Sequence, residues 1–264
     1  MQGVPMSRSV KAAAVQFNIA LGEVGPNLEH VRQSLQTLAA DGVQLAVLPE
    51  MWGTGFAYKE LNRLAESTGD LVEELAKLSA EYGMVIVGSL PEPHADKVYN
   101  TAYVLDNGKM RGKYRKIHLF SLMQEDRSFD SGNSWLVTDT TVGRVGVFIC
   151  YDLRFPELAR RLAVEGAEIL VVPGEWPKPR QEHWRTLLRA RAIENQLFVV
   201  AANCCGVVGK LDFFGMSMII DPKGELLAEA GYEPGNITAL LDFTSMAAWR
   251  EQIPCFTDRK PECY

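Results

Sequence analysis

Short apolar runs of strand length alternate with segments that have the spacing of amphipathic helices along most of this chain. Strands that alternate with helices join into parallel or mixed sheets, and hairpins add antiparallel strands to them. The pattern predicts an α/β protein with two mixed sheets packed back to back and helices outside, an α-β-β-α sandwich. Periodicity alone also allows one doubly wound sheet. The strand-like runs are residues 11–17, 45–48, 84–90, 145–149, 168–172 and 197–202.

Local signals predict where several elements begin and end. Asn27 is a candidate cap for a helix that ends at Gly42, and Asp70 and Glu73 have the spacing of a capping box. A helix over residues 183–195 has Trp184, Leu187, Leu188 and Ile193 available for burial. The Asn107-Gly108 pair predicts a hairpin between strands at 98–105 and 109–115. Strands at 216–220, 225–229 and 237–241 are expected to form a meander, followed by a short helix at about 245–251.

Composition narrows the classes of partner. The 264 residues, 47% of them hydrophobic, are predicted to form a single domain over 1–264, because no linker-like segment divides them. A net charge of −6 without a long basic run argues against nucleic acid or a membrane as partner and favours a small molecule. Residues 1–8 lack the apolar core of a signal peptide, and five cysteines are an odd number without disulfide or zinc spacing. We therefore expect a cytoplasmic protein with reduced thiols.

Cys150 stands where a strand pattern ends and a helix pattern starts. Residues 145–149 read as a buried strand, Pro156 suits the first turn of a helix, and Gly166 ends that helix. A thiol beside a helix N-terminus is expected to have a lowered pKa, and the free N–H groups there can hold an oxyanion. The alternative is structural, since free cysteine often behaves as a small buried hydrophobe.

Two further titratable residues also follow apolar strand patterns. Glu50 comes after the run at 45–48 and Pro49, and Lys116 follows the second strand of the hairpin. If these strands lie side by side, the two residues meet Cys150. A carboxylate can then take the thiol proton, an ammonium can stabilise an oxyanion, and a cysteine can hold an acyl group as a thioester. Together they predict amide hydrolysis without a metal or any other cofactor.

The segments around these residues resemble the three signatures of the nitrilase superfamily of carbon–nitrogen hydrolases. They read LPE at 48–50, YRKIHL at 114–119 and CYDLRFPE at 150–157. The resemblance spans most of the chain and implies the α-β-β-α fold, together with pairing of subunits into homodimers or larger homo-oligomers.

The same resemblance implies a role for each residue. Glu50 would be the general base, Lys116 the cation beside the tetrahedral intermediate, and Cys150 the nucleophile. Glu125 matches the second glutamate, which positions the lysine in that superfamily. The oxyanion would lie between Lys116 and the backbone N–H of Tyr151. His118 is expected to hold the lysine segment by hydrogen bonding.

Residues 176–180 and 183–196 resemble the omega-amidase branch, which removes the terminal amide of 2-oxo dicarboxylic monoamides such as 2-oxoglutaramate and 2-oxosuccinamate. Arg154 and Trp176 could line the substrate pocket, and an arginine would suit a carboxylate on the substrate; helix-surface and packing roles are the alternative. Other members of the superfamily remain alternatives: an N-carbamoyl amino acid amidohydrolase, a deaminated-glutathione-type amidase, a nitrilase, or a catalytically silent binding protein on the same scaffold.

Overall fold

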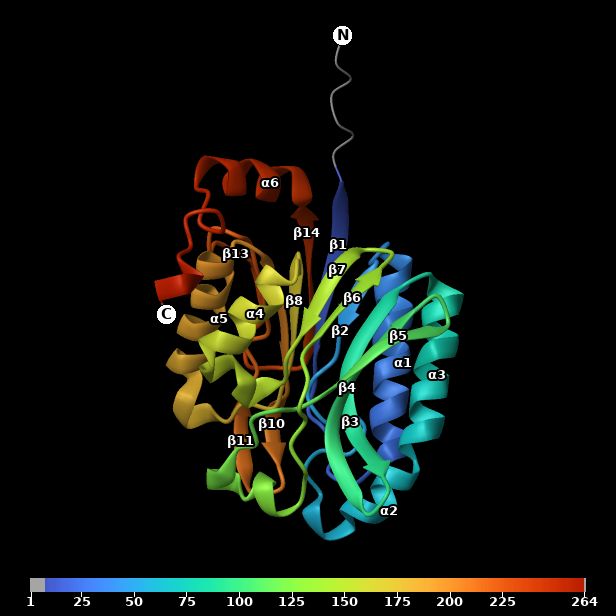
Figure 1. Cartoon of the computed structure of the whole chain (residues 1–264). Helices are drawn as coiled ribbons and strands as arrows, with labels where there is room; N and C mark the ends of the chain where they lie inside the picture. The colour runs from blue at the N-terminus through green and yellow to red at the C-terminus, as the bar shows by residue number, and fades with distance from the viewer. Residues whose placement is uncertain (1–7, 264) are drawn as a thin grey trace.

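Two six-stranded mixed sheets form the centre of the molecule in the computed structural model, which describes residues 8–263 (Figure 1). The first sheet has the strand order β14-β1-β2-β3-β4-β5. Its strands are β1 (Ser9–Gln16), β2 (Leu45–Val47), β3 (Val85–His94), β4 (Lys97–Asp106), β5 (Lys109–Arg115) and β14 (Gly235–Asp242). The second has the order β13-β12-β9-β8-β7-β6. Its strands are β6 (Leu136–Thr140), β7 (Gly143–Val147), β8 (Ile169–Gly174), β9 (Phe198–Asn203), β12 (Met218–Ile220) and β13 (Leu226–Glu229).

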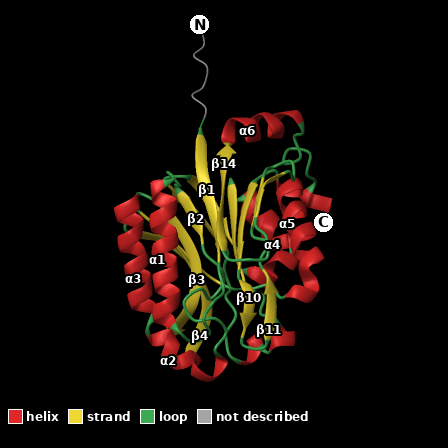
Figure 2. Cartoon of the chain, turned by 180° about the vertical axis from the view of Figure 1, so that it is seen from behind, coloured by secondary structure: helices red, strands yellow, loops and turns green. Residues whose placement is uncertain are grey.

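Helices cover the outer faces of both sheets. Figures 1 and 2 show α1 and α3 beside the first sheet and α4 and α5 beside the second, so the predicted α-β-β-α sandwich is confirmed. The single doubly wound sheet is excluded. A short α2 precedes α3, and α6 lies beyond the end of β14. The helices are α1 (Val24–Ala40), α2 (Leu61–Glu66), α3 (Thr68–Tyr82), α4 (Pro156–Val164), α5 (Gln181–Asn195) and α6 (Phe243–Gln252).

The side chains of β3 show how the layers are held together. Val85 and Val87 belong to the core between the two sheets, whereas Ile86 packs in the core beneath α1 and α3. Successive strand residues point to opposite faces, so a strand buried on both faces is apolar at every position. This explains why the strand segments of the sequence are continuous apolar runs.

The hairpin expected at Asn107-Gly108 joins β4 to β5, and both turn residues have positive φ, as a two-residue turn of this kind requires. The expected cap positions of two helices are wrong. Asn27 lies inside α1, where its buried side chain bonds to Ala20 and to the Gly53 carbonyl. Asp70 lies in the first turn of α3, which begins at Thr68 without a side-chain cap.

The C-terminal strand also departs from the expected meander. β12 and β13 pair with each other, but β14 crosses to the first sheet and pairs antiparallel with β1 along its whole length, from Ser9 opposite Asp242 to Gln16 opposite Gly235. A separate two-stranded ribbon, β10 (Cys205–Val208) with β11 (Leu211–Phe214), was not predicted. Within residues 8–263, no helix combines the length and the apolar character needed to cross a membrane.

Candidate active site

Glu50, Lys116 and Cys150 meet between the two sheets, although the first two belong to one sheet and the cysteine to the other. Glu50 follows β2, Lys116 follows β5, and Cys150 follows β7. Backbone bonds tie two of these residues to other strands: the Lys116 N–H donates to the Asn100 carbonyl in β4, and the Glu50 N–H donates to the Gly174 carbonyl at the end of β8. All three side chains line one pocket. The expected convergence of the three strand ends is therefore present.

Lys116 makes ion pairs with two carboxylates in a fully enclosed position. Its Nζ lies 2.8 Å from Glu50 Oε1 and 2.8 Å from both oxygens of Glu125, and all three side chains are at most 2% exposed. Burial alone would lower the pKa of Lys116, but the Glu125 and Glu50 carboxylates together raise it well above its usual value. The two carboxylates therefore favour the charged form of the lysine, and Glu125 contacts it through both oxygens.

Every oxygen of Glu50 has a donor. Asn100 Nδ2 donates to Oε1 at 2.7 Å and also reaches Glu125 Oε1 at 3.3 Å, while the backbone N–H of Glu175 donates to Oε2 at 3.1 Å. Burial raises the pKa of Glu50, and the Lys116 cation opposes that rise. A carboxylate with a raised pKa in reach of a thiol suits a general base.

Cys150 has a left-handed backbone conformation, with φ of +44°, at the first residue of the 3-10 helix η4 (Cys150–Arg154). A non-glycine residue at positive φ carries backbone strain, which is concentrated at functional sites. The expected lowering of the thiol pKa is wrong. Burial and then the Glu50 carboxylate raise it well above its ordinary value, and α4 starts only at Pro156, too far away to compensate. Both causes favour the neutral thiol over the thiolate in the resting site.

Asp152 ties η4 to the segment that carries Lys116. Its Oδ2 accepts from the Tyr114 hydroxyl at 2.7 Å and from the Ile149 N–H at 2.9 Å. Its Oδ1 accepts from the His118 N–H at 3.0 Å and lies 2.7 Å from His118 Nδ1. His118 therefore holds the lysine segment by hydrogen bonding, as expected from the sequence.

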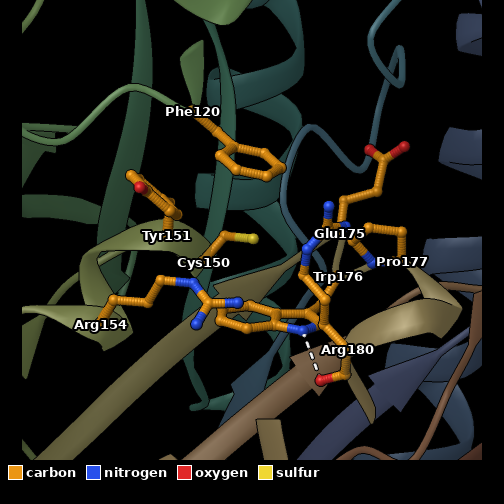
Figure 3. A pocket seen from close by; sticks show the side chains of 8 residues that line it. All are labelled: Phe120, Cys150, Tyr151, Arg154, Glu175, Trp176, Pro177 and Arg180. Atoms are coloured by element: carbon orange, nitrogen blue, oxygen red, sulfur yellow. Dashed lines mark hydrogen bonds between the residues drawn. The ribbon is translucent and has the colours of Figure 1, made fainter. Parts of the chain in front are cut away.

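Two adjoining pockets open on the cysteine and share Phe120, Cys150 and Glu175. The lysine pocket is lined by Glu50, Phe56, Tyr58, Lys116, Phe120, Met123, Glu125, Cys150 and Glu175. The cysteine pocket is lined by Phe120, Cys150, Tyr151, Arg154, Glu175, Trp176, Pro177 and Arg180 (Figure 3).

Arg154 and Trp176 both line the cysteine pocket, which favours the pocket role over the helix-surface alternative. The Arg154 guanidinium lies over the Trp176 ring at 4.6 Å from its centroid and contacts His183 Nδ1 at 3.3 Å. The Trp176 indole N–H donates to the Arg180 carbonyl at 3.0 Å, the bond drawn in Figure 3. Tyr151 follows the cysteine and packs against Phe120, with ring centroids 4.7 Å apart.

Sequence reasoning did not select three residues that the fold places in the site. Asn100 is an ordinary strand position by pattern, and only its place opposite two carboxylates makes it notable. Glu175 and Arg180 follow β8 in the segment that leads to α5, and the available signals were a carboxylate between two prolines and an arginine directly after a third. Among residues 8–263, no group of three or more His, Cys, Asp or Glu side chains is placed to hold a metal ion.

Comparison with known proteins gives consistent matches over nearly the whole chain. The family model described as carbon-nitrogen hydrolase matches residues 11–251. A 2-oxoglutaramate amidase of Bacillus subtilis is 38% identical over 96% of this chain and 98% of its own length, and the omega-amidase NIT2 of Homo sapiens is 33% identical over 97% of each. The structure of Saccharomyces cerevisiae Nit3, a member of branch 10 of the nitrilase superfamily, superposes with a TM-score of 0.89 at 29% identity over 97% of both chains.

Proposed function

The chain belongs to the carbon–nitrogen hydrolase family of the nitrilase superfamily, and from that membership we propose that it is an omega-amidase acting on 2-oxo dicarboxylic monoamides. It is an enzyme that hydrolyses carbon–nitrogen bonds of the amide type. The substrates that fit the proposal are 2-oxoglutaramate and 2-oxosuccinamate, whose terminal amide becomes a carboxylic acid with release of ammonia.

The observation that carries the proposal is that two guanidinium groups line the same pocket as the candidate nucleophile. Arg154 and Arg180 both border the cysteine pocket, and neither forms an ion pair with a carboxylate among residues 8–263. Burial lowers the pKa of Arg154, and Tyr151 opposes this effect in part. The neighbouring Arg180 cation lowers the pKa further. Two cations that repel each other in a small pocket are stabilised by an anionic ligand, and guanidinium groups suit carboxylates. A substrate with a carboxylate at one end and an amide at the other satisfies both parts of the site.

Acylation begins in the neutral resting state. Glu50 takes the proton of Cys150 as the sulfur attacks the amide carbon, so the thiolate forms only as it reacts. The carbonyl oxygen becomes an oxyanion between Lys116 Nζ and the backbone N–H of Tyr151, which lies in the first turn of η4 and has no partner within that helix. Collapse of the tetrahedral intermediate breaks the carbon–nitrogen bond, and Glu50 returns the proton to the departing nitrogen as ammonia leaves.

Deacylation uses the same base. A water molecule that enters from the pocket gives its proton to Glu50 and attacks the thioester, and the second oxyanion occupies the same place beside Lys116. Cleavage of the carbon–sulfur bond, with Glu50 giving the proton to the departing sulfur, releases the acid and restores the thiol and the carboxylate. Intact mass spectrometry during turnover is expected to detect an acyl adduct on Cys150; its absence in a slowed variant would contradict this scheme.

The substrate class is tested by ammonia release from 2-oxoglutaramate, glutamine and an N-carbamoyl amino acid. We expect a clear preference for the oxo-amide, and Cys150→Ala is expected to abolish release while retaining the fold. Arg154→Met and Arg180→Met are each expected to lower kcat/KM for 2-oxoglutaramate about 10- to 100-fold, because a charged hydrogen bond is lost. The uncharged amide butyramide serves as the control and should be little affected. Equal losses on both substrates would contradict carboxylate binding by the arginines.

The family membership also supports a proposal about assembly and location. We propose a homodimer or larger homo-oligomer that works in the cytoplasm on a small-molecule substrate, without a nucleic-acid or membrane partner. Sedimentation equilibrium is expected to give a mass of at least twice the 29.3 kDa of one chain. A mass of one chain at micromolar concentration would contradict this.

A further inference from the structure

Glu175 is a buried carboxyl group at the reaction centre for which the mechanism above has no use. It follows β8, lines both the cysteine pocket and the lysine pocket, and is only 4% exposed (Figure 3). Within residues 8–263, neither oxygen of its side chain forms a hydrogen bond or an ion pair, and Oε2 is completely enclosed. A buried polar group without a partner destabilises the folded state, so its presence here needs a reason.

The charge balance of the site determines the protonation state of this carboxyl. Lys116 is the one cation in the lysine pocket, and it already contacts Glu50 and Glu125 at 2.8 Å. A third carboxylate would give the enclosed cluster a second uncompensated negative charge. Burial, and then the Glu50 carboxylate, raise the pKa of Glu175 well above its usual value. At neutral pH the side chain is therefore a neutral carboxylic acid.

The residues that line the two pockets offer both donors and acceptors to a primary amide. Lys116 and the backbone N–H of Tyr151 offer donors to the carbonyl oxygen. Glu50 and Glu175 offer acceptors, and they are held together because the Glu175 N–H donates to Glu50 Oε2. A primary amide has an acceptor oxygen and an NH₂ group that donates, so it can use both kinds of group.

We propose that Glu175, as a neutral carboxylic acid, accepts a hydrogen bond from the amide nitrogen of the substrate and so positions the scissile bond over Cys150. This inference rests on the proposed amide hydrolysis and adds a substrate-contacting residue to it. The bond gives the unpartnered carboxyl its missing contact and leaves Glu50 free to handle the proton.

Neutrality is essential to this role. The attacking sulfur gains negative charge as Glu50 takes its proton, and an ionised Glu175 beside both would oppose that charge and attract Lys116 away from the oxyanion. Activity is therefore expected to fall at high pH as Glu175 ionises. The titratable groups that face it are Glu50, Tyr58, Lys116, Glu125, Cys150 and Cys204, and Arg180 lines the same cysteine pocket.

Two variants separate hydrogen bonding from packing. Glu175→Gln keeps the shape and an acceptor oxygen but cannot ionise, so we expect kcat/KM within about threefold of the original enzyme and a shift of the alkaline decline to higher pH. Glu175→Leu fills the space without an acceptor and is expected to lower kcat/KM about 10- to 100-fold. The thermal transition checks folding, and replacing an unpartnered buried carboxyl by Leu should not lower it. Full activity in Glu175→Leu, or an unchanged alkaline decline in Glu175→Gln, would overturn the proposal.

A second measurement keeps this test separate from the identity of the natural substrate. Iodoacetamide is a primary amide that alkylates thiols, whereas methyl methanethiosulfonate modifies them without an amide group. Glu175→Leu is expected to slow the modification of Cys150 by iodoacetamide about tenfold and to leave modification by the thiosulfonate unchanged. Equal rates with iodoacetamide in both proteins would overturn the role of Glu175. Failure of 2-oxoglutaramate as a substrate would overturn only the proposed function.

Discussion

Asn100 shows how a neutral side chain can control the charged groups around it. Its amide donates to Glu50 Oε1 and to Glu125 Oε1, and it lies between the two carboxylates that share Lys116. A donor to a carboxylate favours the ionised form, so Asn100 helps to keep Glu50 deprotonated in a site where burial favours the acid. We therefore expect Asn100 to act on the reaction through the proposed base, Glu50.

Replacing Asn100 by Ala tests this role. Removing the donor raises the pKa of Glu50 further, so a larger fraction of the base is protonated at a given acidic pH. The acidic limb of the kcat/KM profile is expected to move to higher pH, and kcat at neutral pH to fall about tenfold. Initial rates between pH 5 and 9 measure both effects. A uniform loss of rate with an unmoved acidic limb would indicate a packing role.

Residues of this kind show the limit of sequence reasoning at the residue scale. Glu50, Lys116 and Cys150 could be selected because each follows an apolar strand pattern and stands in a recognisable motif. Asn100 stands inside a strand pattern, and nothing local marks it. Its importance comes from a hydrogen bond to Glu50, which is 50 positions away in the sequence. The direction of the pKa shift of Cys150 was also out of reach, since it depends on burial and on the Glu50 carboxylate.

At the scale of elements, η4 is held in its strained position by Asp152. This one side chain accepts hydrogen bonds from the strand end before η4, from β5 and from the segment after Lys116. It is completely buried, and its contacts hold Cys150 and Lys116 in a fixed relation. The arrangement explains how a positive φ at Cys150 can persist.

We expect Asp152→Asn to weaken the fold and the reaction together. The asparagine amide has one acceptor oxygen where the carboxylate has two. Either the Tyr114 and Ile149 donors or the His118 donor therefore lose their partner, at a cost of about 1–3 kcal/mol in the free energy of unfolding. Urea unfolding followed by circular dichroism measures that cost, and kcat is expected to fall because η4 shifts. Tyr114→Phe is the matched control, since it removes one of these bonds and leaves the carboxylate. A smaller loss in Asp152→Asn than in this control would contradict the argument.

Glu92 crosslinks three neighbouring strands of the first sheet. From β3 it accepts bonds from Thr101 in β4 and from Lys113 and Arg115 in β5, at distances from 2.5 to 2.9 Å. Burial would raise the pKa of Glu92, but the bonds from Arg115 and Lys113 outweigh it and lower the pKa to about 2. The carboxylate therefore stabilises the folded state more than the carboxylic acid does.

This shift predicts how the variant Glu92→Gln depends on pH. Because the folded-state pKa is depressed, the stabilisation is fully present above the ordinary pKa of 4.5 and is lost as the pH falls towards about 2. Glu92→Gln is expected to lower the free energy of unfolding by about 2–3 kcal/mol at pH 7, with the difference shrinking below pH 4.5. Urea titrations at pH 7 and pH 4 test this. A difference that is constant with pH would contradict it.

The sequence predicted the ends of helices and strands correctly where the conformation of one or two residues determines them. It failed where tertiary contacts determine them. Asn107-Gly108 forces its turn through positive φ at both residues, and Gly166 at φ of +91° follows α4 as expected. Asn27 looked like a helix cap, yet its amide is used to bond the Ala20 and Gly53 carbonyls inside the protein. Ile193, expected to be buried on α5, is 50% exposed, whereas Trp184 and Leu188 are buried as expected.

At the scale of the whole molecule, β14 brings the two ends of the chain together in one sheet. This strand comes from the end of the sequence and pairs with β1 at its beginning, while β13 remains in the second sheet. Local patterns predicted a strand near residues 237–241 but could not choose its partner, because pairing across 200 residues leaves no periodic signal. Strands that are apolar on both faces need cover on both, but helices on both faces of one sheet meet that need as well as two sheets packed back to back, so periodicity alone did not decide between the two folds.

The active site spans both sheets, and this makes activity a measure of their packing. Glu50 and Lys116 come from the first sheet and Cys150 from the second, and one continuous core between the sheets contains side chains of both. The prediction of a single domain over residues 1–264, made from composition and the lack of a linker-like segment, implies that neither sheet remains folded when the other unfolds.

Equilibrium unfolding in urea tests that prediction. Far-ultraviolet circular dichroism reports both sheets, tryptophan fluorescence reports Trp52 beside the first sheet and Trp184 beside the second, and ammonia release reports the site between them. We expect the three transitions to coincide, because separating the sheets exposes the core that stabilises each of them. Deleting residues 235–263 should abolish the transition altogether, since it removes β14, α6 and the buried side chains of Leu241, Phe243 and Met246. Loss of activity at a urea concentration that leaves the dichroism unchanged would show that the sheets separate before they unfold and would contradict the single-domain prediction.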